Sequence, residues 1–131
     1  MWRVDVMGKN IRRLPDSELT VMQALWACGE PATRAHIEQN LPADHDMALT
    51  TLLTLLTRLN EKGFLAAEKA GRGNIYTPLI TREDYLAAQS RRFVDQLCGG
   101  SMSVLASALC GSGLSKEELA QLRQLLEEDS L

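Results

Sequence analysis

The chain has 131 residues, of which 45% are hydrophobic, and its formal net charge is −3. This length suits one compact domain, or a small domain with a helical appendage. Its apolar runs are too short to insert into a membrane, and its acidic balance provides no bulk attraction to nucleic acid.

The amino-terminal residues predict a tail followed by two helices. Residues 1–14 mix charged with apolar residues and lack the apolar core of a signal peptide, so they are assigned to a tail. A helix is expected to begin with Asp16 as its N-cap and to end at Gly29. Thr33 is expected to cap a short second helix that stops at Pro42.

A third helix is predicted at residues 46–62, where leucine and threonine are strictly segregated. Its leucines fall on one helical face, which is expected to be the core face: Leu49, Leu52, Leu53, Leu55, Leu56 and Leu59. The other face carries Thr50, Thr51, Thr54, Thr57 and Arg58. Threonine is a mediocre helix former, so an exposed row of threonines requires a reason. Short polar side chains let a helix approach base edges in the DNA major groove, and the alternative is a merely solvated face.

A β-hairpin is predicted after this helix. Two short segments, 65–69 and 74–78, flank the glycine-rich sequence at 70–73. Three helices followed by a hairpin is the element order of a winged helix, which places the threonine face on a helix that can read DNA.

Few basic side chains are suited to phosphate contacts. Residues 1–78 carry nine Lys/Arg and nine Asp/Glu, whereas residues 79–131 carry five and eight, so DNA binding must depend on local placement of charge. Arg72 is the best candidate, because the glycines beside it let the hairpin tip approach a DNA backbone closely. Arg34 near the start of the second helix and Lys69 on the first strand are further candidates.

Three more helices are expected beyond the hairpin. Thr81 caps a long helix, a short apolar helix follows the glycine pair at 99–100, and a last helix opens with a Ser115/Glu118 capping box. Their apolar stripes are too large for so short a segment to bury alone, so residues 79–131 are predicted to form a helical dimerisation domain. The side chains expected at the dimer interface are Tyr85, Phe93, Leu97, Leu105, Leu119, Leu122 and Leu126.

Enzymatic chemistry is not expected. The sequence has no phosphate-binding loop, dinucleotide fingerprint or nucleophile elbow. A loop that combines His45 with Asp44 and Asp46 is more simply solvated than metal-binding, and no metal or cofactor is expected. Three sparse cysteines without an export signal favour a reduced cytoplasm. A regulator that senses a small ligand, or thiol oxidation through Cys98 or Cys110, remains an open alternative.

Five segments together resemble the penicillinase/methicillin-resistance repressor family, also called BlaI/MecI/CopY. They cover about residues 14–127 and read LPDSELTVMQALW, TLLTLLTRLNEKGFL, GRGNIYTPLI, FVDQLCGGSMSVLA and LSKEELAQLRQLL. The resemblance implies a homodimeric repressor that binds an inverted-repeat operator in double-stranded DNA. Its fold would be mainly α with a small β-hairpin: a winged-helix domain at 15–78, then a helical dimerisation domain at 79–131.

The resemblance also identifies departures from the family. Members often carry basic residues at the positions of Thr50 and Leu53, so the operator sequence does not follow from it. Beta-lactam-responsive members are inactivated when a membrane sensor-protease cleaves an Asn-Phe bond. The matching pair here is Ser107-Ala108, so the same cleavage is not expected. The chain lacks the Cys-x-Cys motifs of the copper-responsive branch. A winged-helix protein–protein interaction module without DNA binding is the alternative function.

Overall fold

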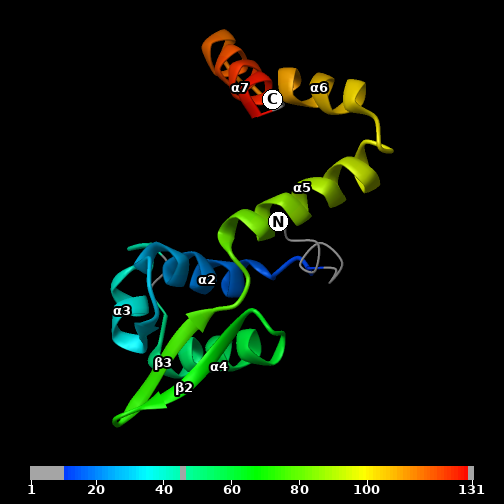
Figure 1. Ribbon diagram of the computed structural model, residues 1–131. Helices are drawn as coiled ribbons and strands as arrows, with labels where there is room; N and C mark the ends of the chain where they lie inside the picture. Colours follow the sequence, from blue (N-terminus) through cyan, green and yellow to red (C-terminus); the bar gives the residue numbers. More distant parts are fainter. Residues whose placement is uncertain (1–10, 45–46, 130–131) are drawn as a thin grey trace. The chain divides into compact units, whose positions relative to one another are not determined.

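The computed structural model describes residues 11–44 and 47–129. These residues fall into two compact units that divide between Gln89 and Ser90. In chain order the elements are α2 (Asp16–Cys28), β1 (Ala32–Thr33), α3 (Arg34–Gln39), α4 (Leu49–Glu61), β2 (Leu65–Ala70), β3 (Gly73–Pro78), α5 (Arg82–Leu97), α6 (Met102–Gly111) and α7 (Lys116–Asp129) (Figure 1).

The first unit combines α2, α3 and α4 with a three-stranded antiparallel sheet in the order β1-β3-β2. The central strand is β3, whose Tyr76 pairs with Ala32 of β1 on one side and with Ala67 of β2 on the other. The predicted hairpin is therefore confirmed. The additional strand β1 was not predicted, because two residues are too few to display an alternating pattern.

Helix α4 is fixed in the first unit by its leucines. Leu52, Leu55, Leu56 and Leu59 are all buried in the hydrophobic core. Full burial of a leucine side chain stabilises a fold by about 1.5–3 kcal/mol. The helix ends as predicted, with Gly63 at a φ of 82°, and the N–H of Phe64 donates to the carbonyl of Leu59 at 2.9 Å.

The start of the first unit differs from the predicted tail. Ile11 and Leu14 are 6% and 1% exposed and belong to the core. Their neighbours Arg12 and Arg13 are exposed, so the four-residue sequence is half core and half surface. The sequence pattern did not reveal this apolar pair, because two arginines separate Ile11 from Leu14. The rest of the predicted tail, residues 1–10, lies outside the described residues.

The first turns of α5 also pack into the first unit. Tyr85 is buried, with its ring 5.8 Å from that of Trp26 and 5.9 Å from that of Phe64, between centroids. The predicted domain boundary after residue 78 therefore differs from the division after Gln89. The prediction that Tyr85 lies at a dimer interface is wrong, because the core of its own unit encloses it.

Helix starts follow the predicted caps with one exception. The hydroxyl of Thr33 accepts a hydrogen bond from the N–H of His36, as a capping residue does. Asp16, by contrast, is the first helical residue of α2, and Pro15 occupies the N-cap without a side-chain hydrogen bond. The carboxylate of Asp16 still lies in the first turn, where a helix dipole favours negative charge. Helix α3 ends at Gln39, before the predicted stop at Pro42.

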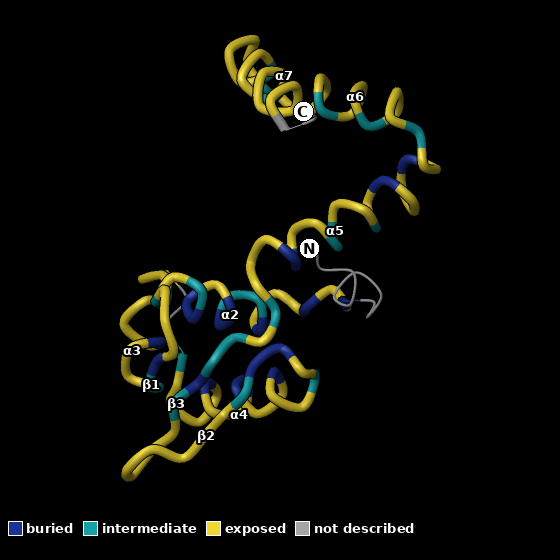
Figure 2. Tube along the Cα trace, in the orientation of Figure 1, coloured by how far each residue is buried: buried dark blue, intermediate teal, exposed yellow. Residues whose placement is uncertain are grey.

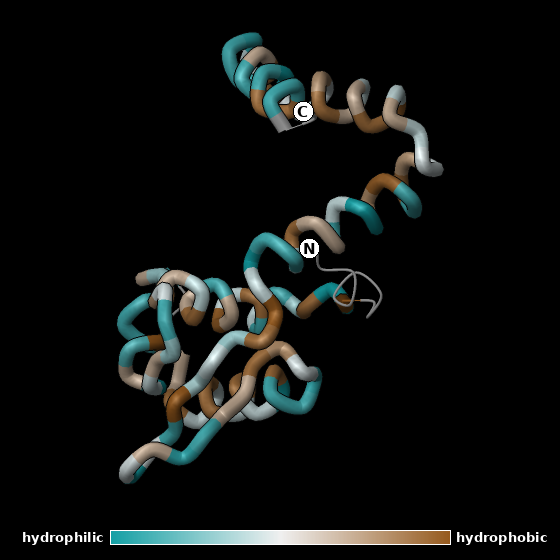
Figure 3. Tube along the Cα trace, viewed as in Figure 1, coloured by the Kyte–Doolittle hydropathy of each residue, from teal (hydrophilic) through white to brown (hydrophobic). Residues whose placement is uncertain are grey.

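The second unit has little core of its own. Among its described residues only Val94 and Cys98 are buried hydrophobics, and α6 contains no buried residue (Figure 2). Helix α6 is nevertheless largely hydrophobic (Figure 3). Helix α7 of the second unit begins with the predicted reciprocal capping box, which Ser115 and Glu118 form. Apolar surface thus remains uncovered within this unit.

No single helix in the described part of the chain is long and apolar enough to cross a membrane. The bent pair α5 and α6 reaches that length and hydropathy only when both helices are counted together.

Candidate nucleic-acid interface

The outer face of α4 carries the predicted threonine row. Thr50, Thr51, Thr54, Thr57 and Arg58 are all exposed. A shallow hollow of about 240 Å³ lies on this face and is lined by Thr50, Thr51, Thr54, Leu55 and Arg58. The face is therefore open to a partner. It carries the positive charge of Arg58 and, one turn beyond Thr57, the negative charge of the exposed Glu61, while DNA contact by the threonines and Arg58 stays a prediction.

Two leucines predicted for the core face of α4 are exposed instead. Leu49 is 46% exposed and Leu53 is 40% exposed. The buried stripe of α4 is narrower than a simple division of the helix into two faces suggests, because Leu52, Leu55 and Leu59 already fill the contact with the core. Leu49 and Leu53 border the threonine row, so the outer face is more apolar than the sequence pattern predicts.

Two threonine hydroxyls on α4 are engaged by the helix itself. The hydroxyl of Thr54 donates to the carbonyl of Thr50 at 2.9 Å, and that of Thr57 donates to the carbonyl of Leu53 at 3.0 Å. A hydroxyl has a single donor hydrogen, so these two side chains offer only a methyl group and oxygen lone pairs to a partner.

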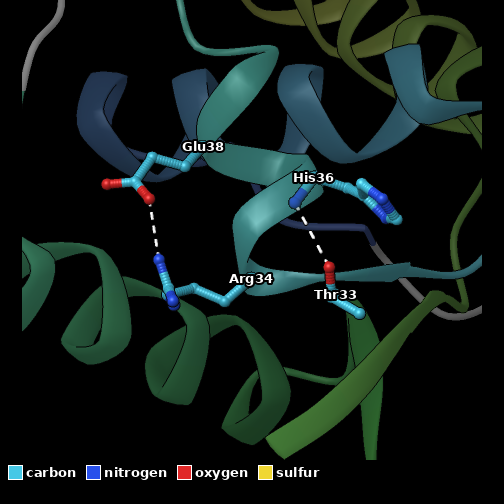
Figure 4. Close-up of polar contacts among 4 residues, drawn as sticks. All are labelled: Thr33, Arg34, His36 and Glu38. Atoms are coloured by element: carbon cyan, nitrogen blue, oxygen red, sulfur yellow. Dashed lines mark hydrogen bonds and ion pairs between the residues drawn. The ribbon is translucent and has the colours of Figure 1, made fainter.

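Arg34 differs from the other predicted phosphate contacts because its charge is paired. Its guanidinium Nη1 lies 2.7 Å from Oε1 of Glu38, one turn along α3. Figure 4 shows the Arg34 side chain pointing toward Glu38, beside the Thr33 cap of the same helix. The ion pair is solvent-exposed and so contributes little to stability, but it reduces the net positive charge that α3 presents.

The wing, which is the β2–β3 hairpin, places two exposed basic residues at its end. Gly71 has a φ of 63°, as the first residue of a tight hairpin turn does, and Arg72 follows it in the turn between β2 and β3. Lys69 lies beside it on β2. No described carboxylate lies within ion-pair distance of Arg58, Lys69 or Arg72. These three cations are therefore available for phosphate groups.

The end of α4 is anchored to α2 by an ion pair that sequence reading missed. The ammonium of Lys62 contacts the carboxylate of Glu18, which is 3% exposed as a residue, whereas the lysine side chain is 26% exposed. The two residues lie 44 positions apart, so no local pattern links them. The contact fixes the carboxyl-terminal end of α4 against the core, and so fixes the direction of its outer face.

The second unit brings most of the predicted dimer residues together. A mainly apolar groove of about 450 Å³ between α6 and α7 is lined by Met102, Leu105, Ala106, Leu109, Cys110, Leu119, Leu122, Arg123, Leu126 and Glu127. Phe93 and Leu97 are exposed on α5 and are not part of this lining. The candidate proteolytic pair Ser107-Ala108 is exposed within α6.

The cysteines occupy three different environments. Cys98 is buried, Cys110 is exposed, and Cys28 is half-buried. Burial raises the pKa of the Cys28 thiol, although a hydrogen bond from Asn40 opposes the shift. No cluster of three or more His, Cys, Asp or Glu among the residues described could hold a metal ion. His45 and Asp46 of the loop considered above lie outside the described residues.

Helices α2, α3 and α4, the short strand β1 and the β2–β3 hairpin define a winged-helix protein, as the sequence predicted. The sequence profile of the Penicillinase repressor family matches residues 14–128. The Penicillinase repressor of Bacillus licheniformis is 35% identical over 121 residues, which cover 92% of this chain and 94% of that protein. The methicillin resistance regulatory protein MecI of Staphylococcus aureus is 26% identical over 123 residues, which cover 93% of this chain and 99% of that protein.

Among solved structures, the monomeric form of Bacillus licheniformis BlaI in complex with the blaP half-operator is 33% identical. The match covers 57% of this chain and 90% of the BlaI chain, with a TM-score of 0.47. The chain belongs to the penicillinase repressor family. It is accordingly a DNA-binding transcriptional repressor of the BlaI type and not an enzyme.

Proposed function

We propose that this chain is a homodimeric repressor that binds an inverted-repeat operator in double-stranded DNA. The observation that carries the proposal is the outer face of α4, where a row of short side chains is exposed beside Arg58, which has no ion-pair partner among the described residues. Such a face lets a helix lie close to base edges in the major groove. The cytoplasm is the proposed compartment, because chromosomal operators lie there.

The proposed contacts divide into two kinds. The threonines of α4 face the bases, whereas Arg58, Lys69 and Arg72 neutralise phosphates on the flanking backbone. Each cation is free of a described carboxylate, so none must break an ion pair before it meets DNA. Arg34 contributes least, because Glu38 already compensates its charge.

The proposed dimer uses the groove between α6 and α7. A second copy would cover Leu105, Leu119 and Leu122 with the same apolar surface, and so supply the core that the second unit lacks. Two joined copies bind two half-sites together, which raises operator affinity well above that of a single winged helix. Phe93 and Leu97 on α5 are proposed to extend this interface.

Repression is proposed to end when the dimer weakens. Ser107 and Ala108 are exposed and lie outside the groove lining, and α6 has no buried residue within its own chain, so its folded form depends on packing in the dimer. A cut in this segment, by a membrane sensor-protease or another protease, would separate α7 from the rest of the chain and remove half of the groove. Operator affinity would then fall with dimer concentration.

Selection of bound duplexes from a random DNA pool, followed by titration at several salt concentrations, tests the proposed function. We expect enrichment of an inverted repeat, and an affinity that falls steeply as salt rises, because phosphate contacts release counterions. Failure to enrich any sequence would contradict the proposal.

A protein–protein interaction module is the second candidate, and the exposed leucines Leu49 and Leu53 favour it. The two functions differ in their response to salt. A partner bound through these leucines would stay bound, or bind more tightly, as salt rises. Capture of such a partner, without retention of any duplex, would support the second candidate and exclude the first.

A further inference from the structure

We propose that Leu49 and Leu53 are specificity-determining residues that contact the C5-methyl groups of thymines in the operator. This inference rests on the proposed function, because it assigns the bases that the α4 face reads. Both side chains are among the exposed large hydrophobics of the chain, on a helix whose outer face also carries four threonines, Arg58, Asn60 and Glu61.

The positions of the two leucines give the reading face two unlike sides. Leu49, Leu53 and Thr57 follow one another at i, i+4 spacing, so they form one row along the helix. Thr51 and Arg58 lie on the other side of the threonine row, next to the shallow hollow. One side is thus apolar and the other is polar with a positive charge.

The apolar row offers a base pair almost no hydrogen-bond donor. Leucine has none, and the hydroxyl hydrogen of Thr57 is already given to the carbonyl of Leu53. The hydroxyl of Thr54, at the centre of the face, likewise donates its hydrogen to the carbonyl of Thr50. Asn60, near the far end of the row, is an exposed side chain whose N–H groups have no partner among the described residues, and it lies in the half of the helix that is more distant from the bases.

The major groove presents different groups at each base. Guanine offers two acceptors, N7 and O6, and therefore requires donors from the protein. Thymine offers a methyl group, and adenine and cytosine each offer an amino group that requires an acceptor. A surface of leucine and threonine methyl groups with threonine oxygen lone pairs matches thymine methyls and those amino groups. The row therefore selects thymine and discriminates against guanine.

Removal of the thymine methyl group alone tests the assignment. The probe is the duplex enriched by selection, prepared with deoxyuridine in place of thymidine at one position at a time. Binding of the full chain is compared with that of Leu49→Ala and of Leu53→Ala. Leu79→Ala serves as the matched control, because Leu79 is also exposed but lies beyond the hairpin. Circular dichroism establishes that each variant is folded, which an exposed position favours.

We expect one or more positions in each half-site at which deoxyuridine weakens binding by about fourfold, the effect of one buried methyl group. In Leu53→Ala the same replacement should have a markedly smaller effect, because the partner of the methyl group is gone. Leu79→Ala should respond to deoxyuridine as the unmodified chain does.

Two outcomes would overturn the assignment while leaving the proposed function intact. One is an operator bound with equal affinity whether it contains thymidine or deoxyuridine. The other is a deoxyuridine effect of the same size in the unmodified chain and in both Leu49→Ala and Leu53→Ala. Failure of the selection to enrich any duplex would instead contradict the proposed function, and this inference with it.

Discussion

The backbone N–H of Leu14 donates a hydrogen bond to the hydroxyl of Tyr85 at 2.9 Å, across 71 positions of the sequence. A second hydrogen bond joins the same two segments, from the side-chain amide of Gln89 to the carbonyl of Ile11 at 3.2 Å. The segment before α2 and the first turns of α5 are thus joined inside the first unit. The first turns of α5 are therefore held in this unit by two hydrogen bonds, one buried and one part-buried.

Tyr85→Phe should destabilise the chain by about 1–2 kcal/mol, because it leaves the buried N–H of Leu14 without an acceptor while keeping the ring. Chemical denaturation measures the change in the free energy of unfolding. Tyr76→Phe is the matched control. Among the described residues its hydroxyl accepts only from the Asn74 amide, at 3.5 Å, so the expected change is about 0.5 kcal/mol or less. Equal effects of the two substitutions would contradict the structural role of Tyr85.

Arg72→Ala should weaken binding to the selected operator and to random DNA by the same factor. A phosphate contact carries no sequence information, so its loss reduces the slope of log affinity against log salt by about 1. Filter binding at four or more salt concentrations measures the slope. Arg82→Ala removes an equal charge from the start of α5, away from the wing, and should leave the slope nearly unchanged. A change in sequence preference with Arg72→Ala would show that the residue reads bases.

Leu122→Glu should shift the chain from dimer to monomer and weaken operator binding, because it places a charge in the apolar groove between α6 and α7. Sedimentation analysis measures the oligomeric state. Gln121→Glu introduces the same acidic group one position away, on an exposed site outside the groove lining, and should remain dimeric. If both variants remain dimeric, the dimer forms through another surface.

The chain should resist cleavage in cells that contain a beta-lactam sensor-protease and are exposed to a beta-lactam. Ser107-Ala108 provides neither the amide nor the aromatic side chain of the bond that is cut in beta-lactam-responsive members of the family. Immunoblotting for a fragment that ends near Ser107 is the measurement. Replacement of the pair by Asn-Phe is the positive control, and should restore cleavage. A fragment from the unmodified chain would refute the expectation.

Cys28 should be alkylated with a pH midpoint above that of the same thiol in the unfolded chain. Burial raises its pKa, so the neutral thiol is the favoured form in the folded state. The raised pKa also makes stability depend on pH. Its contribution to the free energy of unfolding is complete below the ordinary thiol pKa and is lost as the pH rises through the raised value. Rates of iodoacetamide labelling against pH, for a chain with Cys98→Ser and Cys110→Ser, measure the midpoint. Identical midpoints in buffer and in denaturant would contradict it.

Local patterns in the sequence were sufficient to predict most of the elements. The caps at Thr33 and Ser115, and the glycine that ends α4, use contacts between residues a few positions apart. The segregation of leucine from threonine predicted α4 and its exposed face for the same reason. Family membership, inferred from residue motifs, is confirmed by the match over residues 14–128.

Such local patterns do not predict contacts between residues that are far apart in the sequence. Tyr85 has the helical spacing of a dimer residue, and only the packing of Trp26 and Phe64 around it reveals that it is a core residue. The burial of Ile11 and Leu14 and the pairing of Glu18 with Lys62 depend on segments that meet only after folding. Leu49 and Leu53 were assigned to the core because periodicity gives the direction of a face but not its width.

Four residues of α4 are buried in the core, namely Leu52, Leu55, Leu56 and Leu59, and every other residue of the helix is exposed, although Leu55 also lines the hollow on the outer face. Mutations in the outer row therefore alter what the helix meets without disturbing what holds it. A duplicated gene can in consequence drift toward a new target sequence before selection has to repair any loss of folding. The same separation makes this helix a suitable starting point for engineered repressors, in which a library of outer side chains is screened on an unchanged scaffold.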